Sequence, residues 1–267
     1  MTSGHAGTTD QHVTAGIDIG ALTTDVVILS GEQILSSAIV PTLADAEKAA
    51  VSAYESALDR AALTEQDISN VVATGYGRAS IDFASKAVTE ITCHALGARR
   101  LFPEARSVID IGGQDSKVIR LSEDGKVEDF AMNDKCAAGT GRFLEVMARA
   151  LDTDLESLGS LSQLSTQDVR ISSTCTVFAE SEVVALVAKG VPKEDIIRGL
   201  HRSVAERVYA MATRLRAEPP YVMTGGVAKN PGVVTALEQR LNTQLLLPEE
   251  PQIVGALGAA ILASAEP

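Results

Sequence analysis

The chain is poor in aromatic residues and has no tryptophan. Only 3% of its 267 residues are aromatic, whereas 45% are hydrophobic. Its cores must therefore be built from Ala, Val, Leu and Ile, as is common in α/β proteins. This hydrophobic content excludes a disordered tail or linker. A chain of this length is natural for two lobes of about 100–150 residues each.

Basic residues are also scarce, since 23 Lys and Arg stand against 35 Asp and Glu and give a formal net charge of −12. Binding to a nucleic-acid backbone needs clustered Lys and Arg, so we expect no nucleic-acid partner. ATP is not excluded, because it is bound by backbone amides, Mg²⁺ and a few side chains.

Long apolar runs are missing too. The longest, residues 253–263, contains two glycines and is too short to span a bilayer. Residues 1–11 are small and polar and lack the basic and apolar regions of a signal peptide. We therefore expect a soluble, cytoplasmic protein with no membrane partner.

With three cysteines, the chain lacks a disulfide framework. Cys136 lies in NDKCAAGTGRF and Cys175 in SSTCTVFAESE, each just ahead of an apolar helical pattern. We predict a helix starting one or two residues after each thiol. The free amides and the dipole of a helix N-terminus favour a thiolate there. Both thiols would thus suit a metal site.

The number of cysteines limits that site. A 4Fe-4S cluster commonly takes four thiolates, and Cys93 falls within a predicted helix, far from the two motifs. Two cysteines from each of two chains would complete the set on a dimer axis. Three alternatives stay open: free thiols packed as small apolar groups, a Cys136–Cys175 disulfide, and a zinc site of Cys93, His94, Cys136 and Cys175.

A repeat organises the chain. The tetrapeptide IDIG occurs at 17–20 and again at 109–112, and the apolar segment at 26–30 matches the one at 118–122. Each half has the pattern of three strands joined by turns and followed by helices. The sequence therefore predicts a duplicated α/β domain.

The repeat predicts a nucleotide site. Glycine in the turn after each IDI strand lets the backbone approach a ligand, and the turn amides can face phosphate oxygens. Asp18 and Asp110, at the strand ends, are placed to hold Mg²⁺. A third glycine turn, MTGGVAKN at 223–230, follows another strand and is expected at the adenosine.

This order of motifs resembles the acetate and sugar kinase, Hsp70 and actin superfamily. The resemblance implies two duplicated actin-like (ribonuclease H-like) α/β lobes with the nucleotide in the cleft between them. The lobes would span 12–104 and 105–252, and a C-terminal helix at 253–267 would cross back to the first lobe. The nucleotide-binding residues would be Asp18, Gly20, Thr23, Thr24, Gly112, Gly113, Lys117, Gly225, Gly226 and Lys229.

The cysteine motifs make the resemblance more specific. Together with VIDIGGQDSKVI, ATGYGR and MTGGVAKN, they look like the activators of 2-hydroxyacyl-CoA dehydratases. They are similar also to the ATPase subunits of benzoyl-CoA reductases and to the reductases of double-cubane-cluster proteins. The resemblance implies a homodimer in which Cys136 and Cys175 of each subunit hold one 4Fe-4S cluster. ATP hydrolysis would drive one-electron transfer from ferredoxin or flavodoxin to a dehydratase or related acceptor.

Two parts of this scheme are less constrained. Many relatives carry Lys at the position of Asp25 in the first phosphate loop, and Lys117 holds the matching place in the second repeat. Gln114 and Asp115, with Asp110, are candidates to orient the attacking water, although Gln114 and Asp115 could equally only order the turn.

The ATGYGR segment is assigned no chemistry, and His94 and His201 are expected in surface or core roles. A small-molecule kinase and a non-enzymatic scaffold of the same superfamily are the competing functions.

Overall fold

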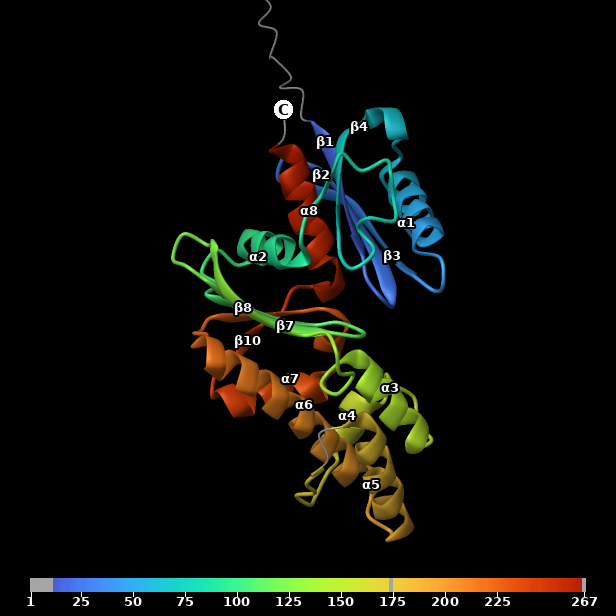
Figure 1. Ribbon diagram of the computed structural model, residues 1–267, viewed down its shortest axis with the longest axis vertical. Coiled ribbons are helices and arrows are strands. Elements are labelled where there is room, and N and C mark those ends of the chain that lie inside the picture. The colour runs from blue at the N-terminus through green and yellow to red at the C-terminus, as the bar shows by residue number, and fades with distance from the viewer. Residues whose placement is uncertain (1–11, 173–174, 266–267) are drawn as a thin grey trace, which may run out of the picture. The chain divides into compact units, whose positions relative to one another are not determined.

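The computed structural model describes residues 12–172 and 175–265. Its described residues form two compact units. The first contains the residues up to Cys93 together with those from Gly255 onward, and the second runs from His94 to Val254. Each unit is built on one five-stranded mixed sheet flanked by helices (Figure 1). No helix within the described ranges is long and apolar enough to cross a membrane.

The first unit has strand order β3-β2-β1-β4-β5. Its elements are β1 (Val13–Ile19), β2 (Thr23–Ser30), β3 (Gln33–Pro41), α1 (Ala46–Ala61), β4 (Ile68–Thr74), β5 (Lys86–Ala87) and α8 (Val254–Ser264), with a short 3-10 turn at Glu65–Asp67. Helix α2 (Glu90–Leu101) begins in this unit and continues into the second.

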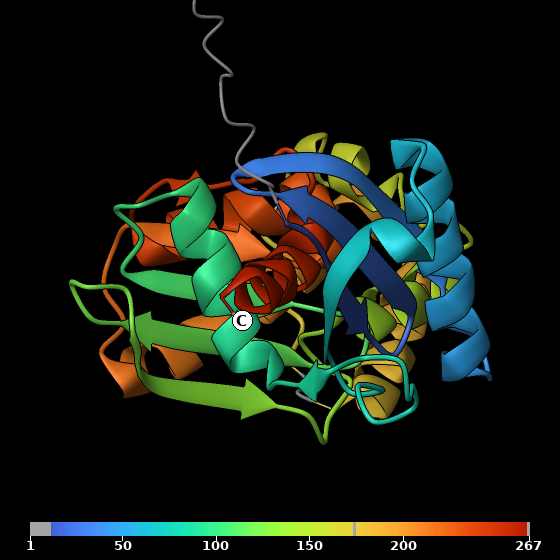
Figure 2. The same cartoon turned by 90° about the horizontal axis from the view of Figure 1, so that it is seen from above.

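The alternation of side chains along β1 places a helix on each face of the first sheet. Ile17 belongs to the apolar cluster that α1 covers with a row of alanines. Gly16 faces the other way, where a Cβ would lie only 2.0 Å from the carbonyl oxygen of Ala256 in α8. Figure 2 shows α1 and α8 on opposite sides of the sheet. Glycine at position 16 is therefore what lets α8 pack directly on β1.

The second unit has strand order β10-β9-β6-β7-β8. Its strands are β6 (Ser107–Ile111), β7 (Ser116–Leu121), β8 (Val127–Asn133), β9 (Tyr221–Thr224) and β10 (Leu245–Leu246). Its helices are α3 (Gly141–Ala150), α4 (Leu158–Gln163), α5 (Thr176–Ala188), α6 (Lys193–Leu215) and α7 (Pro231–Leu241), with 3-10 turns η2 (Gly226–Lys229) and η3 (Pro251–Ile253).

Alternation also separates the two faces of β6. Ile109 and Ile111 point into the large apolar cluster formed with α3, α6 and α7. Asp110, between them, points to the face where His94 of α2 lies. A buried carboxylate is thus fixed at the strand end, opposite the main core.

The two sheets have the same topology, which confirms the predicted duplication. Three antiparallel strands (β1–β3 and β6–β8) are followed in each unit by a strand parallel to the first, β4 beside β1 and β9 beside β6. A short parallel edge strand completes each sheet, β5 or β10. This is the duplicated actin-like α/β fold.

Candidate functional site

The two IDIG segments form equivalent turns. Gly20 N–H donates to the carbonyl oxygen of Thr23 at 2.9 Å, and Gly112 N–H donates to that of Asp115 at 3.0 Å. Each bond closes the hairpin directly after the strand that carries the aspartate shared by the two repeats, β1 or β6. Both predicted phosphate loops therefore exist as tight turns at a strand end, where amides can face an anion.

A second pair of equivalent turns lies beside them. The parallel register pairs Asp18 with Thr74 in one unit and Asp110 with Thr224 in the other. The next residues, Gly75 and Gly225, have φ of +84° and +83°. A Cβ would lie 2.6 Å from the Ile19 carbonyl oxygen at Gly75 and 2.4 Å from the Ile111 one at Gly225. Glycine is required at both positions for conformation and for close approach.

Gly77 ties this turn to the first phosphate loop. Its N–H donates to the Ile19 carbonyl oxygen at 2.9 Å, so the ATGYGR segment supports the end of β1. Sequence reasoning had assigned this segment no chemistry. The available signal was the Thr-Gly dipeptide that ends the fourth strand of both repeats.

Asp110 is the centre of a buried polar network. Lys117 Nζ donates to its Oδ2 at 3.0 Å and to Asp115 Oδ1 at 2.9 Å. Thr224 Oγ1 donates to Asp110 Oδ1 at 2.9 Å. Because a hydroxyl has a single proton, the contact of 3.2 Å between Thr224 Oγ1 and His94 Nδ1 must use a proton on the histidine. His94 Nδ1 also lies 3.7 Å from Asp110 Oδ1.

The network keeps Asp110 ionised. Burial by itself would raise the pKa of this carboxyl, but the His94 imidazole, the Lys117 ammonium and the bonds from Lys117 and Thr224 outweigh it and hold the pKa far below its usual range. Asp110 is therefore a fixed negative charge at the end of β6. Sequence reasoning missed His94, because nothing local places α2 beside this strand.

The first unit has a different charge at the matching position. Cross-strand register pairs Asp18 with Asp25, where the second unit pairs Asp110 with Lys117. Asp18 and Asp25 are 8% and 6% exposed, and Thr23 Oγ1 donates to Asp25 Oδ2 at 3.3 Å. Two buried carboxylates side by side favour a cation between or beside them.

Other residues of the predicted site lie as follows. Thr24 is fully buried, and its hydroxyl contacts that of Thr42, which donates to the Gly20 carbonyl oxygen. Thr24 thus supports the turn from inside the unit. Gln114 is exposed at the tip of the second turn. Lys229 ends η2, which begins at Gly226, and forms an ion pair of 2.8 Å with Glu250.

Cys136 lies in a loop rather than at a helix N-terminus. Helix α3 begins at Gly141, so the prediction of a helix one or two residues after this thiol is wrong. Gly139 has φ of +88°, and Thr140 donates to the Ala137 carbonyl oxygen through both N–H and Oγ1. Residues 137–140 therefore form a turn, and the helix begins only after it.

The loop is anchored at both ends. Asn133 Nδ2 donates to the carbonyl oxygens of Cys136 at 2.8 Å and Ala138 at 3.1 Å. At the other end, the first amides of α3 reach the second phosphate loop: Gly141 N–H donates to the Gly112 carbonyl oxygen at 2.9 Å and Arg142 N–H to that of Gly113 at 2.8 Å. The loop that carries Cys136 and the second predicted phosphate loop are therefore joined, through the start of α3, by two backbone hydrogen bonds.

Cys175 does precede its helix directly, as predicted, since it is the N-cap of α5. The thiol is exposed. Residues 173 and 174 of its motif lie outside the described residues. Along α5, the large side chains Val177, Phe178 and Val184 are 66%, 68% and 54% exposed, which leaves an apolar surface next to the thiol.

Cys93 is set apart from the other two cysteines by burial. It is fully buried in the first unit, where burial raises the pKa of its thiol to about 12. All three cysteines are free thiols, so the alternative of a Cys136–Cys175 disulfide is not realised here. Within 12–172 and 175–265, no three His, Cys, Asp or Glu side chains are grouped so that they could hold a metal ion, which includes the zinc set.

Comparison with known proteins gives consistent matches over almost the whole chain. Residues 15–263 match the model of the BadF/BadG/BcrA/BcrD ATPase family. The activator of lactoyl-CoA dehydratase from Anaerotignum propionicum is 48% identical over 94% of this chain and 96% of its own. The (R)-2-hydroxyglutaryl-CoA dehydratase activating ATPase from Acidaminococcus fermentans is 47% identical over 94% and 96%.

A solved structure extends the match to three dimensions. The activator of the 2-hydroxyisocaproyl-CoA dehydratase from Clostridium difficile, with bound ADPNP, superposes with a TM-score of 0.91 at 45% identity. The superposition covers 95% of this chain and 94% of that one. That relative thus shares this fold and binds an ATP analogue.

Proposed function

Because the chain belongs to the BadF/BadG/BcrA/BcrD ATPase family, we propose that it hydrolyses ATP in order to activate a 2-hydroxyacyl-CoA dehydratase or a related iron–sulfur enzyme. The activation is one-electron transfer, with reduced ferredoxin or flavodoxin as the donor. The observation that carries this proposal is the pair of backbone hydrogen bonds that joins the second predicted phosphate loop to the loop that carries Cys136, through Gly141 and Arg142.

The nucleotide is proposed to bind at the turns of each repeat. The amides of the turns at Gly20 and at Gly112–Gly113 are the proposed donors to its phosphates, and the Gly225–Gly226 turn is the proposed contact for the adenosine. Asp18 and Asp110 are the proposed acceptors for Mg²⁺ and its water ligands. Lys117 forms ion pairs with Asp110 and Asp115, and Lys229 forms one with Glu250. Carboxylates therefore fix the ammonium groups of both lysines in place.

Hydrolysis needs a group that orients water toward the terminal phosphate. Gln114 and Asp115 are the candidates. Gln114 is exposed at the tip of the turn, whereas Asp115 is tied to Lys117. Because the Asp115 carboxylate already accepts a hydrogen bond from Lys117, Gln114 is the better candidate to orient the water and Asp115 to order the turn.

A 4Fe-4S cluster is proposed to be held by Cys136 and Cys175 of two chains. The donor set fits: thiolates are the ligands such clusters take, and each chain offers two. Cys175 is exposed beside the apolar side chains of α5, which is suitable for a homodimer contact at the same place. The cluster would supply one-electron transfer at low potential.

The loop between Asn133 and Gly141 is the proposed link between the two functions. A shift in the position of the Gly112 and Gly113 carbonyl groups on nucleotide exchange would move the amides of Gly141 and Arg142, which are hydrogen-bonded to them. The loop that carries Cys136 would move with these amides. Asn133 holds the other side of that loop. Hydrolysis would in this way alter the surroundings of the thiol within one compact unit.

Iron and acid-labile sulfide of anaerobically purified protein provide the test, with its mass in solution and its EPR spectrum after dithionite reduction. We expect about four iron and four sulfide per dimer and a reduced-cluster signal that MgATP changes. Cys136→Ser and Cys175→Ser should lose iron, whereas Cys93→Ala, which alters the buried thiol, should keep it. Iron-free protein that still hydrolyses ATP after reconstitution would contradict the proposal and favour a small-molecule kinase.

A further inference from the structure

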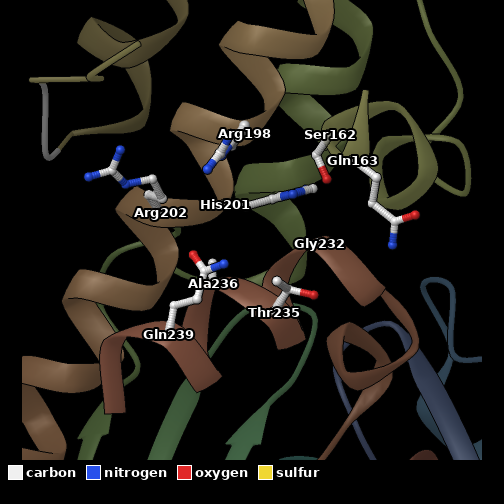
Figure 3. A pocket seen from close by; sticks show the side chains of 9 residues that line it. All are labelled: Ser162, Gln163, Arg198, His201, Arg202, Gly232, Thr235, Ala236 and Gln239. Atoms are coloured by element: carbon white, nitrogen blue, oxygen red, sulfur yellow. The ribbon is translucent and has the colours of Figure 1, made fainter. Parts of the chain in front are cut away.

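A pocket of about 310 Å³ opens among α4, α6 and α7 of the second unit. Its size is at the lower end of small-molecule sites, which span about 300–1,000 Å³. Ser162 and Gln163 come from α4, Arg198, His201 and Arg202 from α6, and Gly232 from α7. Figure 3 shows the polar side chains from all three helices around it. No carboxylate lines it, although the chain is acidic overall.

The tautomer of the buried His201 follows from its neighbour. Asn230 caps α7, and its Oδ1 accepts from the N–H groups of Gly232 at 2.9 Å and Val233 at 3.2 Å. The amide orientation is thereby fixed, so Asn230 Nδ2 is the donor toward His201 Nε2, 3.4 Å away. Nε2 must accept, and the proton of the neutral ring is on Nδ1.

That Nδ1–H group is a buried donor without a partner. His201 is 1% exposed, and its Nδ1 forms no hydrogen bond with any described residue. Burial lowers the pKa of His201 to about 4, so the ring is neutral near pH 7. A buried donor with no acceptor destabilises the fold. A ligand atom that accepts this proton would remove the destabilisation.

Ser162 provides a second polar atom at the floor of the pocket. Its hydroxyl donates to the Gly159 carbonyl oxygen at 2.8 Å, which leaves the oxygen lone pairs as acceptors. A Cβ placed on Gly232 would be 2.2 Å from His201 Nδ1 and 2.4 Å from Ser162 Oγ, so the two atoms flank the same point. A ligand hydroxyl can accept from the first and donate to the second.

The arginines supply positive charge above that floor. Arg198 and Arg202 are one helical turn apart and therefore lie on the same face of α6. Arg202 is paired with Asp168, which does not line the pocket. Arg198 is exposed, and the Asp195 carboxylate, one turn earlier in α6, interacts with it electrostatically. No hydrogen bond or ion pair to another residue of 12–172 or 175–265 holds its guanidinium, which can therefore take a bidentate oxyanion.

We propose that this pocket binds a small hydroxylated oxyanion. Its carboxylate or phosphate group would bind Arg198 and Arg202, and a hydroxyl would bind His201 Nδ1 and Ser162 Oγ. Glycine at position 232 keeps a Cβ from displacing these two atoms. The residues that line the pocket include none of the proposed nucleotide or cysteine residues. Asn230, which bonds His201, ends the 223–230 segment expected at the adenosine, so the test includes competition by ADP.

Titration calorimetry on the full chain with three probes tests the site. Glycerol 3-phosphate and glycerate carry hydroxyls with a phosphate or a carboxylate, and the stronger binder identifies the anion. Propyl phosphate lacks the hydroxyls and should bind more weakly than glycerol 3-phosphate. Arg198→Gln should weaken glycerol 3-phosphate binding by about tenfold or more, because it removes the charge-assisted hydrogen bonds of the guanidinium. Arg214→Gln, an exposed arginine of α6 outside the pocket, is the matched control.

Nitrogen-15 NMR of the native chain supplies a readout that needs no variant. The Nδ1–H signal of His201 should shift on addition of glycerol 3-phosphate and stay unchanged with propyl phosphate. Absence of binding by both glycerol 3-phosphate and glycerate would overturn the proposal. Displacement of the bound probe by ADP, or an equal loss of affinity in Arg214→Gln, would overturn it as well.

Discussion

Replacing Lys117 by Met should destabilise the second unit severely. The ammonium lies 3.0 Å from Asp110 Oδ2 and 2.9 Å from Asp115 Oδ1, and the Lys117 and Asp110 side chains are 5% and 4% exposed. Met has nearly the same length, so packing is retained and the charge alone is removed. Removal of one partner of a buried ion pair costs about 3–5 kcal/mol. Urea unfolding of the nucleotide-free protein, followed by circular dichroism, measures this loss.

A second substitution separates charge from packing. Asp110→Asn in the Lys117→Met background removes the carboxylate that the first change leaves without its ammonium partner. The double variant should therefore be more stable than Lys117→Met by about 1–3 kcal/mol. If it is less stable than the single variant, the unpaired carboxylate is not the cause of the loss.

The pH dependence of the free energy of unfolding tests the contribution of the Lys117–Asp110 ion pair in a second way. In the wild type, Asp110 has a strongly lowered pKa, so its contribution is complete above the ordinary carboxyl pKa and is lost as the pH falls below it. In Lys117→Met, the charge and the hydrogen bond of Lys117 no longer lower that pKa, while His94 and Thr224 still do and burial still raises it. The pKa of Asp110 therefore rises from its wild-type position, and the stability deficit should shrink as the pH falls and the carboxylate is protonated. A deficit below about 1 kcal/mol, or one that is constant with pH, would refute this account.

Three further predictions concern other parts of the molecule. Asn133→Ala removes the bonds to the carbonyl oxygens of Cys136 and Ala138; ATP hydrolysis should persist, while the MgATP-induced change in the EPR signal of the reduced protein should be lost. His201 has a pKa lowered from 6.5 to about 4, so the unfolded chain takes up its proton first as the pH falls. The wild type should lose about 2 kcal/mol more than His201→Phe between pH 7 and pH 5 in urea unfolding. Gly16→Ala would place a Cβ 2.0 Å from the Ala256 carbonyl oxygen; overpacking of this kind costs about 1–3 kcal/mol, measurable as faster hydrogen exchange in β1.

The duplicated fold could be predicted because it depends on patterns that are local. Alternating apolar residues define β1 and β6, and the IDIG tetrapeptides place a glycine turn after each. Strand order then follows from hairpins and one parallel return in each half. The Thr-Gly turn at Gly75 was overlooked although its match with Gly225 is visible in the sequence. The missing step was to extend the repeat to the fourth strand.

The remaining errors have physical causes outside the local pattern. The apolar residues after Cys136 suggested an immediate helix, but Gly139 adopts a positive φ and the turn at Thr140 is completed first. His94 lies against Asp110 only because α2 packs near β6, which no local signal specifies. The tautomer of His201 depends on Asn230 in another helix cap. Tertiary contacts decide each of these features.

The β1–β2 and β6–β7 hairpins have the same backbone arrangement but differ in charge, and this difference gives them unequal roles. In the second repeat, Lys117 offsets Asp110 and Asp115, so the turn amides can face a phosphate without two uncompensated negative charges behind them. In the first, Asp25 stands at the matching register position beside Asp18. A metal ion at Asp18 would face two neighbouring carboxylates, whereas at Asp110 it would share the carboxylate with the Lys117 ammonium. Asp18 is therefore the stronger of the two proposed acceptors for Mg²⁺, an asymmetry that follows from one side chain rather than from the repeat itself.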